Sequence, residues 1–196
     1  MSYNDEWPES DDSGHSSRRR SSKPKFRKPK VLEPEDLTPE EWDEKARTAL
    51  LNQLTRGPRT KKQLAQMLAR KFVPEGIATA LLDRFEEVQL IDDAAYAKAF
   101  AHDRRLSRGL SKSALKRELG QAGVAVELID DALEAIDSEA DTELAIQLVR
   151  KRWSSVRNLE RDARYRRLSG FLGRRGFSSA AISTAINLVE REQQDV

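Results

Sequence analysis

The sequence predicts an all-α protein built from three tandem three-helix repeats that resemble helix-turn-helix units. Three stretches that begin at Thr60, Ser111 and Tyr165 align without gaps, and apolar residues coincide along them. Leucines four residues apart give the first helix of each stretch one apolar face. No alternation of apolar and polar residues, the pattern typical of strands, stands out. The aligned positions are Leu64, Leu115 and Leu168; Leu68, Leu119 and Leu172; Phe72, Gly123 and Gly176; and Leu82, Leu133 and Ile186.

Each repeat needs a third helix, because one helical hairpin cannot enclose a core. Helical sequence precedes each aligned stretch, at about residues 41–55, 92–108 and 138–153. We therefore predict nine helices, arranged as repeats whose contacts run mainly to their neighbours in an elongated or curved molecule. The predicted repeats span residues 39–90, 91–137 and 138–196.

Residues 1–38 are predicted to form a disordered, charged tail. They are rich in Ser, Pro, Asp, Arg and Lys and have few aliphatic residues, so they cannot bury enough apolar area to offset the entropy cost of ordering. A helix is expected to begin directly after the tail. Thr38 is a preferred N-cap residue, Pro39 suits the first helical position, and the acids Glu40 and Glu41 favour the first turn.

The composition excludes several classes of protein. Of 196 residues, 38% are apolar and 35% are charged, which favours thin helical layers over one large core. Cysteine is absent, so disulfide frameworks and thiolate metal sites are excluded. No apolar run is long enough to span a bilayer, and the N-terminus has no apolar core of a signal peptide. We expect a cytoplasmic protein that has no membrane contact and needs no cofactor.

The stretch LIDDAAYAKAFAHDRRLSRGL, at residues 90–110, contains two adjacent aspartates, Asp92 and Asp93. A metal or acid/base role would need further ligands or a nucleophile, and no such cluster recurs at suitable spacing. We therefore predict that the pair starts a helix. On a helical wheel, one side carries Ala95, Tyr96, Ala99, Phe100 and Leu106, and the other Lys98, Arg104, Arg105 and Arg108. Asp103 falls on the apolar side, which requires a buried partner, an early helix end or a partly exposed face.

Charge is segregated along the chain, although the net charge is only +2. Residues 118–143 contain many acids and no Lys or Arg, whereas residues 150–175 are dominated by arginine. Such blocks create signed surface fields that bear on the choice of partner. The predicted partner-binding residues are Arg104, Arg105, Arg108, Lys112, Lys116 and Arg117, followed by Arg150, Lys151 and Arg152.

Residues 90–124 resemble the central signature of the RecX regulatory proteins of bacteria. That signature is an aliphatic residue and two aspartates, an aromatic–Ala pair, a Phe, an Arg, a Gly, and a Leu–basic–Gly–aliphatic ending. The matching residues are Leu90, Asp92, Asp93, Tyr96, Ala97, Phe100, Arg104, Gly109, Leu119, Gly123 and Val124. Arg56, Arg59 and Thr60 fit an earlier motif of the family, and RRGF at 174–177 fits the closing unit.

The resemblance implies a regulator that is not an enzyme. Proteins of this family bind in the groove of the filament that the recombinase RecA forms on single-stranded DNA, and they usually inhibit its strand exchange, ATP hydrolysis and co-protease activity. We therefore expect RecA filaments as the partner, a monomeric state and weak direct DNA binding. The alternative is a stand-alone nucleic-acid-binding protein that uses helix-turn-helix-like repeats. However, the acidic helix VAVELIDDALEAI would be repelled from a major groove.

Overall fold

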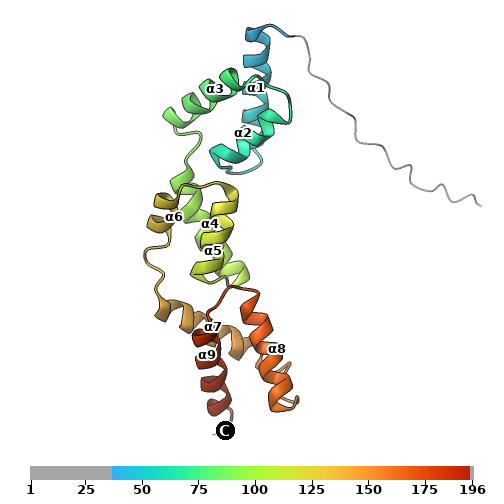
Figure 1. Cartoon of the computed structure of the whole chain (residues 1–196), viewed down its shortest axis with the longest axis vertical. Helices are drawn as coiled ribbons and strands as arrows, with labels where there is room; N and C mark the ends of the chain where they lie inside the picture. Colours follow the sequence, from blue (N-terminus) through green and yellow to red (C-terminus); the bar gives the residue numbers. More distant parts are fainter. Residues whose placement is uncertain (1–36, 195–196) are drawn as a thin grey trace, which may run out of the picture. The chain divides into compact units, whose positions relative to one another are not determined.

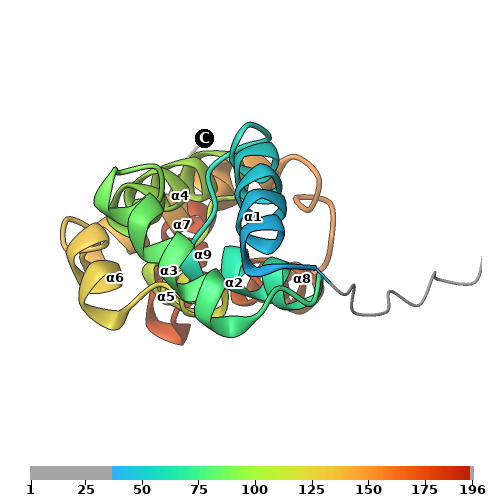
Figure 2. The same cartoon turned by 90° about the horizontal axis from the view of Figure 1, so that it is seen from above.

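The structure is a computed structural model that describes residues 37–194, and these residues are helical except for short connections. Figures 1 and 2 show the helices in chain order, from blue to red. The predicted 1–38 tail lies outside the described residues except for Leu37 and Thr38. The helices are α1 (Pro39–Leu54), α2 (Lys61–Ala69), α3 (Glu75–Glu87), α4 (Asp93–Arg108), α5 (Lys112–Ala122), α6 (Val126–Ala132), α7 (Ser138–Trp153), α8 (Arg161–Gly173) and α9 (Ser179–Glu192).

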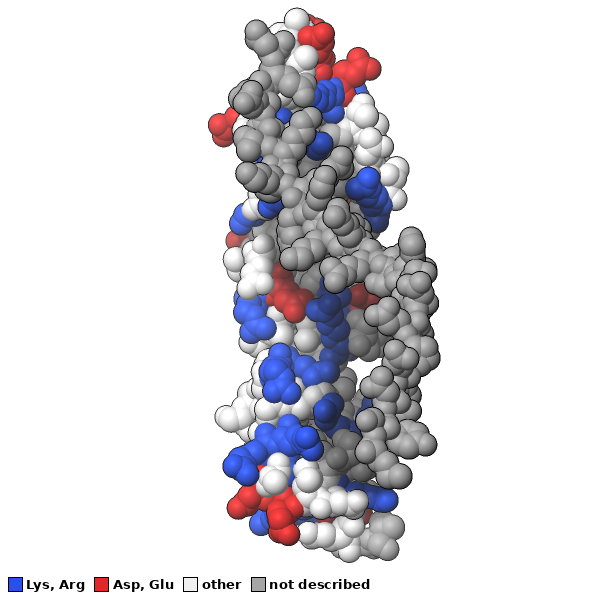
Figure 3. Space-filling view, turned by 90° about the vertical axis from the view of Figure 1, so that its right-hand side faces the viewer, with Lys and Arg blue, Asp and Glu red and all other residues white. Residues whose placement is uncertain are grey.

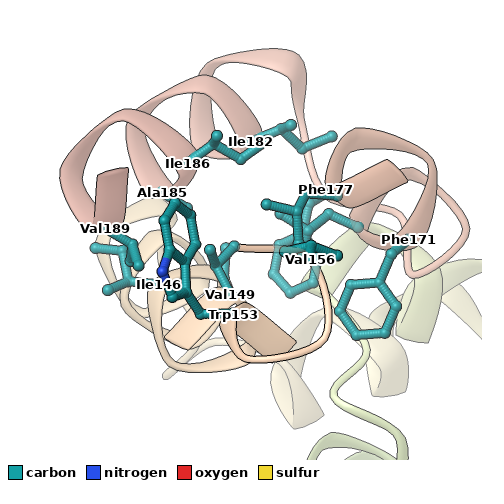
Figure 4. Packing of buried hydrophobic residues seen from close by; sticks show 13 residues of the cluster. Ile146, Val149, Trp153, Val156, Phe171, Phe177, Ile182, Ala185, Ile186 and Val189 are labelled. Atoms are coloured by element: carbon teal, nitrogen blue, oxygen red, sulfur yellow. The ribbon is translucent and has the colours of Figure 1, made fainter. Parts of the chain in front are cut away.

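Three separate hydrophobic clusters define three repeats of three helices each. The first repeat (α1–α3) packs around Leu50, Leu64, Leu68, Leu82 and Phe85. The second repeat (α4–α6) packs around Ala97, Leu115, Leu119, Ile129 and Leu133. The third repeat (α7–α9) packs around Val149, Trp153, Leu168, Leu172 and Ile186, and Figure 4 shows its side chains converging from all three helices. The prediction of three three-helix repeats is confirmed.

The helix starts follow the predicted capping chemistry. Thr38 caps α1 through a capping box with Glu41, and Pro39 occupies the first helical turn. The same box recurs at α2, where Thr60 accepts a hydrogen bond from the backbone of Gln63. Side-chain oxygens at these N-caps satisfy backbone N–H groups that the helix itself leaves unpaired.

The apolar face predicted for α4 is confirmed only in part, because the half-buried Tyr96 and Phe100 pack against the core of the second repeat. The structure buries Ala97 and Ala101 and leaves Ala95, Ala99 and Leu106 exposed, with Leu106 exposed to 74%. Ala97 and Ala101, which the helical wheel did not place on that face, lie in the core of the second repeat together with Ile129 of α6. Asp103 therefore lies in solvent, with its side chain 70% exposed. Of the three explanations left open for Asp103, exposure of the face is the correct one.

Two further apolar residues lie outside the core. Val126 starts α6 and is 58% exposed, although it belongs to the apolar stripe expected for that helix. Leu90 is 50% exposed, whereas its neighbour Ile91 is buried in the cluster of the first repeat. Ile91 therefore packs with the first repeat, and it attaches the connection between α3 and α4 to that repeat.

The first junction is the contact between the first and second repeats. The buried Thr60 hydroxyl, at the N-cap of α2, donates a 2.6 Å hydrogen bond to the carbonyl oxygen of Ala122 at the end of α5. Next to it, the backbone N–H of Lys61 donates to the Asp93 carboxylate at 2.9 Å. Gly123 lies against Lys62 so closely that a Cβ atom at this glycine would come within 2.6 Å of the Lys62 Cβ.

The second junction, between the second and third repeats, uses the equivalent positions. The backbone N–H of Ser111, the N-cap of α5, donates to the carbonyl oxygen of Arg175 at 3.0 Å. The backbone N–H of Lys112 donates to Asp141 at 3.0 Å. Gly176 lies against Ser111 and Ala114. Both junctions therefore join the start of one repeat's second helix to the turn and the first helix of the next repeat.

Candidate functional site

The aspartate pair starts a helix, as predicted, and one member also links two repeats. Asp92 is the N-cap of α4, and its carboxylate accepts a 2.7 Å hydrogen bond from the backbone of Ala95. Asp93 accepts the hydrogen bond from Lys61 across the first junction, and burial raises the pKa of its carboxyl. Among residues 37–194, no group of three or more His, Asp and Glu side chains is placed to hold a metal ion.

Arg105, one of the predicted partner-binding residues, is part of the second junction. Its guanidinium binds the Asp141 carboxylate at 2.6 Å and the carbonyl oxygens of Ala140 and Leu110 at 2.8 and 3.2 Å. The side chains of Arg105 and Asp141 are 19% and 17% exposed. Substitution of Arg105 would therefore alter the junction itself, and it cannot report cleanly on binding of a partner.

Three other predicted residues also have partners within the chain. Lys116 pairs with Asp130 at 2.5 Å, and Arg150 pairs with Glu192 at 2.6 Å, both on the surface. The Arg104 guanidinium stacks 4.9 Å from the centre of the Phe100 ring, and its nearest carboxylate oxygen, from Glu118, is 3.9 Å away. The two surface pairs, of Lys116 and of Arg150, contribute little to stability and exchange readily with other ions.

The remaining five predicted residues form no ion pair with any residue in the described part of the chain. They extend from the end of α4 to the end of α7: Arg108, Lys112, Arg117, Lys151 and Arg152. Four of the five are exposed, and Lys112 is half-buried. Figure 3 shows one face of the molecule on which Lys and Arg side chains outnumber acids. The unpaired cations are therefore available to an anionic or acidic partner.

Three of the predicted basic residues, Lys112, Lys116 and Arg117, line an open groove of about 940 Å³ at the second junction. Asp130 of α6, which pairs with Lys116, also lines the groove, as do Asp137 and Asp141 from the start of α7. The last two acids are also engaged, because Asp137 caps α7 and Asp141 binds Arg105 and Lys112. The charges left without a partner in this groove are consequently positive.

Arg152 was predicted from the sequence as a binding residue, but Arg175, which lies with it beside the second junction, was missed. Arg175 donates hydrogen bonds to the carbonyl oxygen of Arg108, at the end of α4, and to that of Phe171 in α8. Its guanidinium lies 3.8 Å from the centre of the Phe171 ring, and that of Arg152 lies 4.5 Å from it. The RRGF motif at residues 174–177 indicates the turn after α8. It does not indicate that the Arg175 side chain contacts Arg108 and Phe171.

Two more arginines of the 150–175 block are structural. Arg161 and Arg164 both bind Glu190, which is buried although it is charged. The hydrogen bond from Arg164 lowers the pKa of Glu190, against the opposing effect of burial. Arg164 also stacks over the Trp153 ring at 5.0 Å. This buried ion pair joins α8 to α9 inside the third repeat.

The other residues of the motif in residues 90–124 have structural positions. Ala97 and Leu119 are fully buried, and the half-buried rings of Tyr96 and Phe100 stack on each other with centroids 5.7 Å apart. Gly109 and Gly123 end α4 and α5 with φ angles of +63° and +88°, a left-handed conformation that suits glycine. These residues set the shape of the second repeat.

Comparison with known proteins gives consistent matches along the chain. The models of the first, second and third three-helix domains of RecX match residues 46–85, 92–133 and 139–186. Regulatory protein RecX of Streptomyces coelicolor is 43% identical over 153 residues, which cover 78% of this chain and 81% of that protein. The Thermobifida fusca protein of the same name is 40% identical, over 76% of this chain and 78% of its own length.

Solved structures show the same fold. The crystal structure of RecX from Lactobacillus salivarius superposes with a TM-score of 0.67 at 20% identity, and it covers 77% of this chain and 98% of its own. A crystal structure of regulatory protein RecX gives the same TM-score at 27% identity, over 76% and 74%. The chain is thus an all-helical protein of three three-helix domains. It belongs to the RecX family of regulatory proteins.

The region between residues 37 and 194 contains no helix long and apolar enough to cross a membrane.

Proposed function

We propose that this protein is a non-enzymatic, cytoplasmic regulator that binds RecA filaments on single-stranded DNA as a monomer and inhibits their recombinase, ATPase and co-protease activities. Membership of the RecX family supports the regulatory role. The observation that carries the proposal of a binding surface is the set of unpaired cations between the ends of α4 and α7. Such a surface attracts acidic protein or phosphate over distances of about 10 Å at moderate salt.

The elements that hold these cations are suited to such contacts. Arg108 ends α4, Lys112 starts α5 and Arg117 lies one and a half turns further along it, so the charges follow the chain through one corner of the second repeat. The second repeat beneath these cations has a buried apolar core. Ser111 caps the start of α5 and Gly123 ends it, so the ends of this helix are fixed. A partner would therefore meet basic side chains on a preformed scaffold.

ATP hydrolysis by RecA on single-stranded DNA, measured with increasing amounts of the purified protein, tests the proposal. We expect inhibition at substoichiometric to stoichiometric protein, together with co-sedimentation of the protein with preformed filaments. The double charge reversal Arg108→Glu with Arg117→Glu should weaken inhibition roughly tenfold or more, because rim charges govern association of complementary surfaces.

The matched control is the double reversal Arg70→Glu with Arg84→Glu, two exposed arginines of the first repeat with no ion pair in the described part of the chain. It changes the net charge equally and should leave inhibition within about twofold of the unmodified protein. Unchanged ATP hydrolysis and no co-sedimentation at excess protein would disprove the proposal. Equal losses in the two variants would assign the effect to net charge and reject the proposed surface.

A further inference from the structure

We propose a phosphate-binding site beside the second junction, formed by Arg152, Arg174 and Arg175. Arg152 and Arg175 stack on the ring of Phe171, and the positive charge of Arg174 acts on Arg175. Its ligand is a phosphate group, supplied either by a nucleic-acid backbone or by a free phosphate ion. The proposal does not depend on recombinase binding, because it concerns an anion site within this chain alone.

The geometry of the site is fixed by Phe171. Phe171 is only 8% exposed and belongs to the core of the third repeat, which holds its ring in place. In Figure 4 the ring lies at the edge of the labelled side chains. The guanidinium groups of Arg152 and Arg175 stack against it with Cζ atoms 4.5 and 3.8 Å from its centre. Stacking restricts these side chains, so binding an anion costs less conformational entropy than it would with free arginines.

Hydrogen bonding orients Arg175 further. Its Nε and Nη1 atoms donate to the carbonyl oxygens of Arg108 and Phe171, which lie at the ends of α4 and α8. Arginine side chains commonly satisfy such carbonyls, and that role alone explains Arg175. It does not explain Arg152 and Arg174, whose side chains donate no hydrogen bond within residues 37–194 and are exposed. The Nη2 atom of Arg175 likewise has no acceptor within that range.

The electrostatics of the cluster favour an anion. Burial lowers the pKa of Arg175, and the positive charges of Arg152 and Arg174 lower it further. Two other arginines of the third repeat have carboxylates that offset their charge, Arg150 with Glu192 and Arg164 with Glu190. The cluster has no carboxylate partner in the described part of the chain. A bound anion would therefore remove a repulsion that the protein leaves uncompensated.

The number and type of donors indicate phosphate. Arginine presents several N–H groups in a fixed plane and forms paired hydrogen bonds to phosphate oxygens, and three such groups match an anion with several acceptor oxygens. The exposed Arg108 adjoins the cluster, because its carbonyl oxygen accepts the hydrogen bond from Arg175. A chain of phosphates would therefore meet Arg108 as well as the cluster.

The test uses the full-length protein without recombinase. A short fluorescent single-stranded oligonucleotide is titrated with protein at several salt concentrations, and inorganic phosphate is added as a competitor. In a parallel titration, NMR follows the Nε–H signals of Arg152 and Arg174 as phosphate is added to the unmodified protein. The variant Arg152→Gln with Arg174→Gln keeps Arg175 and its structural hydrogen bonds, and Arg70→Gln with Arg84→Gln is the control of equal charge.

If the ligand is a nucleic-acid backbone, the site variant should bind the oligonucleotide about tenfold more weakly than the control, and its salt slope should fall by about 1.4, since each lost single-strand contact removes about 0.7. If the ligand is free phosphate, the two variants should bind the oligonucleotide alike, while phosphate shifts the Arg152 and Arg174 signals of the unmodified protein. Unshifted signals together with equal oligonucleotide binding would overturn the proposal, and the NMR arm does not depend on the variants folding.

Discussion

The two junctions between repeats occupy equivalent positions but use different atoms. At the first junction the Thr60 side chain donates to the carbonyl of Ala122, whereas at the second the backbone of Ser111 donates to the carbonyl of Arg175. A carboxylate from the next repeat accepts a backbone hydrogen bond at both, from Asp93 and from Asp141. At both junctions, therefore, the start of the second helix donates a hydrogen bond to a carbonyl of the next repeat, but the donor is a side chain at the first junction and the backbone at the second.

The second junction differs by adding a cation. Arg105 binds Asp141 and the carbonyl of Ala140, so that the carboxylate is held by an arginine as well as by the start of α5. Asp93 has no arginine partner in the described residues, and burial raises the pKa of its carboxyl. The second junction therefore depends more on charge, and the first more on a single hydroxyl group. Substitutions at matched positions test this difference.

The largest effect is expected for Gly176→Ala. Gly176 has a φ angle of +83°, and a Cβ atom there would lie 2.7 Å from the Ser111 Oγ and 3.1 Å from the backbone nitrogen of Ala114. Left-handed strain and the clash with the start of α5 together should lower the free energy of unfolding by about 2–4 kcal/mol. Urea denaturation followed by circular dichroism measures the change.

The aligned residue of the first repeat provides the contrast. Phe72 adopts a φ angle of +60° although it is not glycine, and its side chain is 43% exposed. Phe72→Gly should raise the free energy of unfolding by up to about 1 kcal/mol, because glycine removes left-handed strain at the cost of some chain entropy. A gain in Phe72→Gly as large as the loss in Gly176→Ala would show that left-handed strain alone, without close packing at the second junction, accounts for the need for glycine.

Asp141→Ala should give the next largest effect. It removes the acceptor of Arg105 and of the Lys112 backbone, and it leaves a guanidinium that is only 19% exposed without its carboxylate. We expect a loss of about 2–3 kcal/mol in the free energy of unfolding. Asp103→Ala, which removes an acid of 70% exposure from α4, is the control and should change stability by less than about 0.5 kcal/mol.

Hydrogen exchange locates the effect of Asp141→Ala. Faster exchange should appear at the start of α5 and α7, while the first repeat keeps its protection. Uniformly faster exchange over all three repeats, without a local change at the second junction, would contradict a junction-specific role of the ion pair.

Much of the fold was predictable because repeated local signals agree. Leucines at matched positions, Thr38 and Asp92 as caps, and glycines after α5 indicate helices, turns and their order without knowledge of the packing. The buried face of α4 was predictable only in part, because Tyr96 and Phe100 do pack on the core, whereas Leu106, predicted on the same face, is exposed and Ala97 and Ala101 are the buried residues. The helical wheel was interpreted from the larger apolar residues, whereas helices that pack closely together favour small residues at their contact.

The candidate site was predictable only in part. Basic residues between α4 and α7 were found from sequence, but the structural role of Arg105 depends on Asp141, which lies 36 positions further along the chain. Arg175 contacts the end of α4 at Arg108, which lies 67 positions earlier in the chain, so its position depends on how the third repeat packs against the second. Long-range partners of this kind decide which charges remain free, and the order of residues alone does not contain them.

A smaller difference is expected between the two N-caps. Thr60→Val removes both the cap of α2 and the buried hydrogen bond to Ala122, and it should cost about 2 kcal/mol. Ser111→Ala removes only the cap of α5, because the cross-repeat bond comes from the backbone, and it should cost about 1 kcal/mol. Thermal unfolding of both variants measures the two losses of stability. A larger loss for Ser111→Ala than for Thr60→Val would show that the Thr60 hydroxyl is not the main link of the first junction.

The smallest effect at neutral pH is expected for Asp93→Asn, which keeps an oxygen acceptor for the Lys61 backbone. Because burial raises the pKa of Asp93 above 3.8 in the folded protein, the protonated carboxyl is favoured by folding. The stability that this group contributes is fully present below its unfolded pKa and is lost as pH rises through the folded value. Relative to Asp93→Asn, the unmodified protein should therefore gain stability as pH falls through this range. Urea unfolding of both proteins across that range measures the difference, and a relative loss on acidification would mean that the ionised carboxylate is what the first junction prefers.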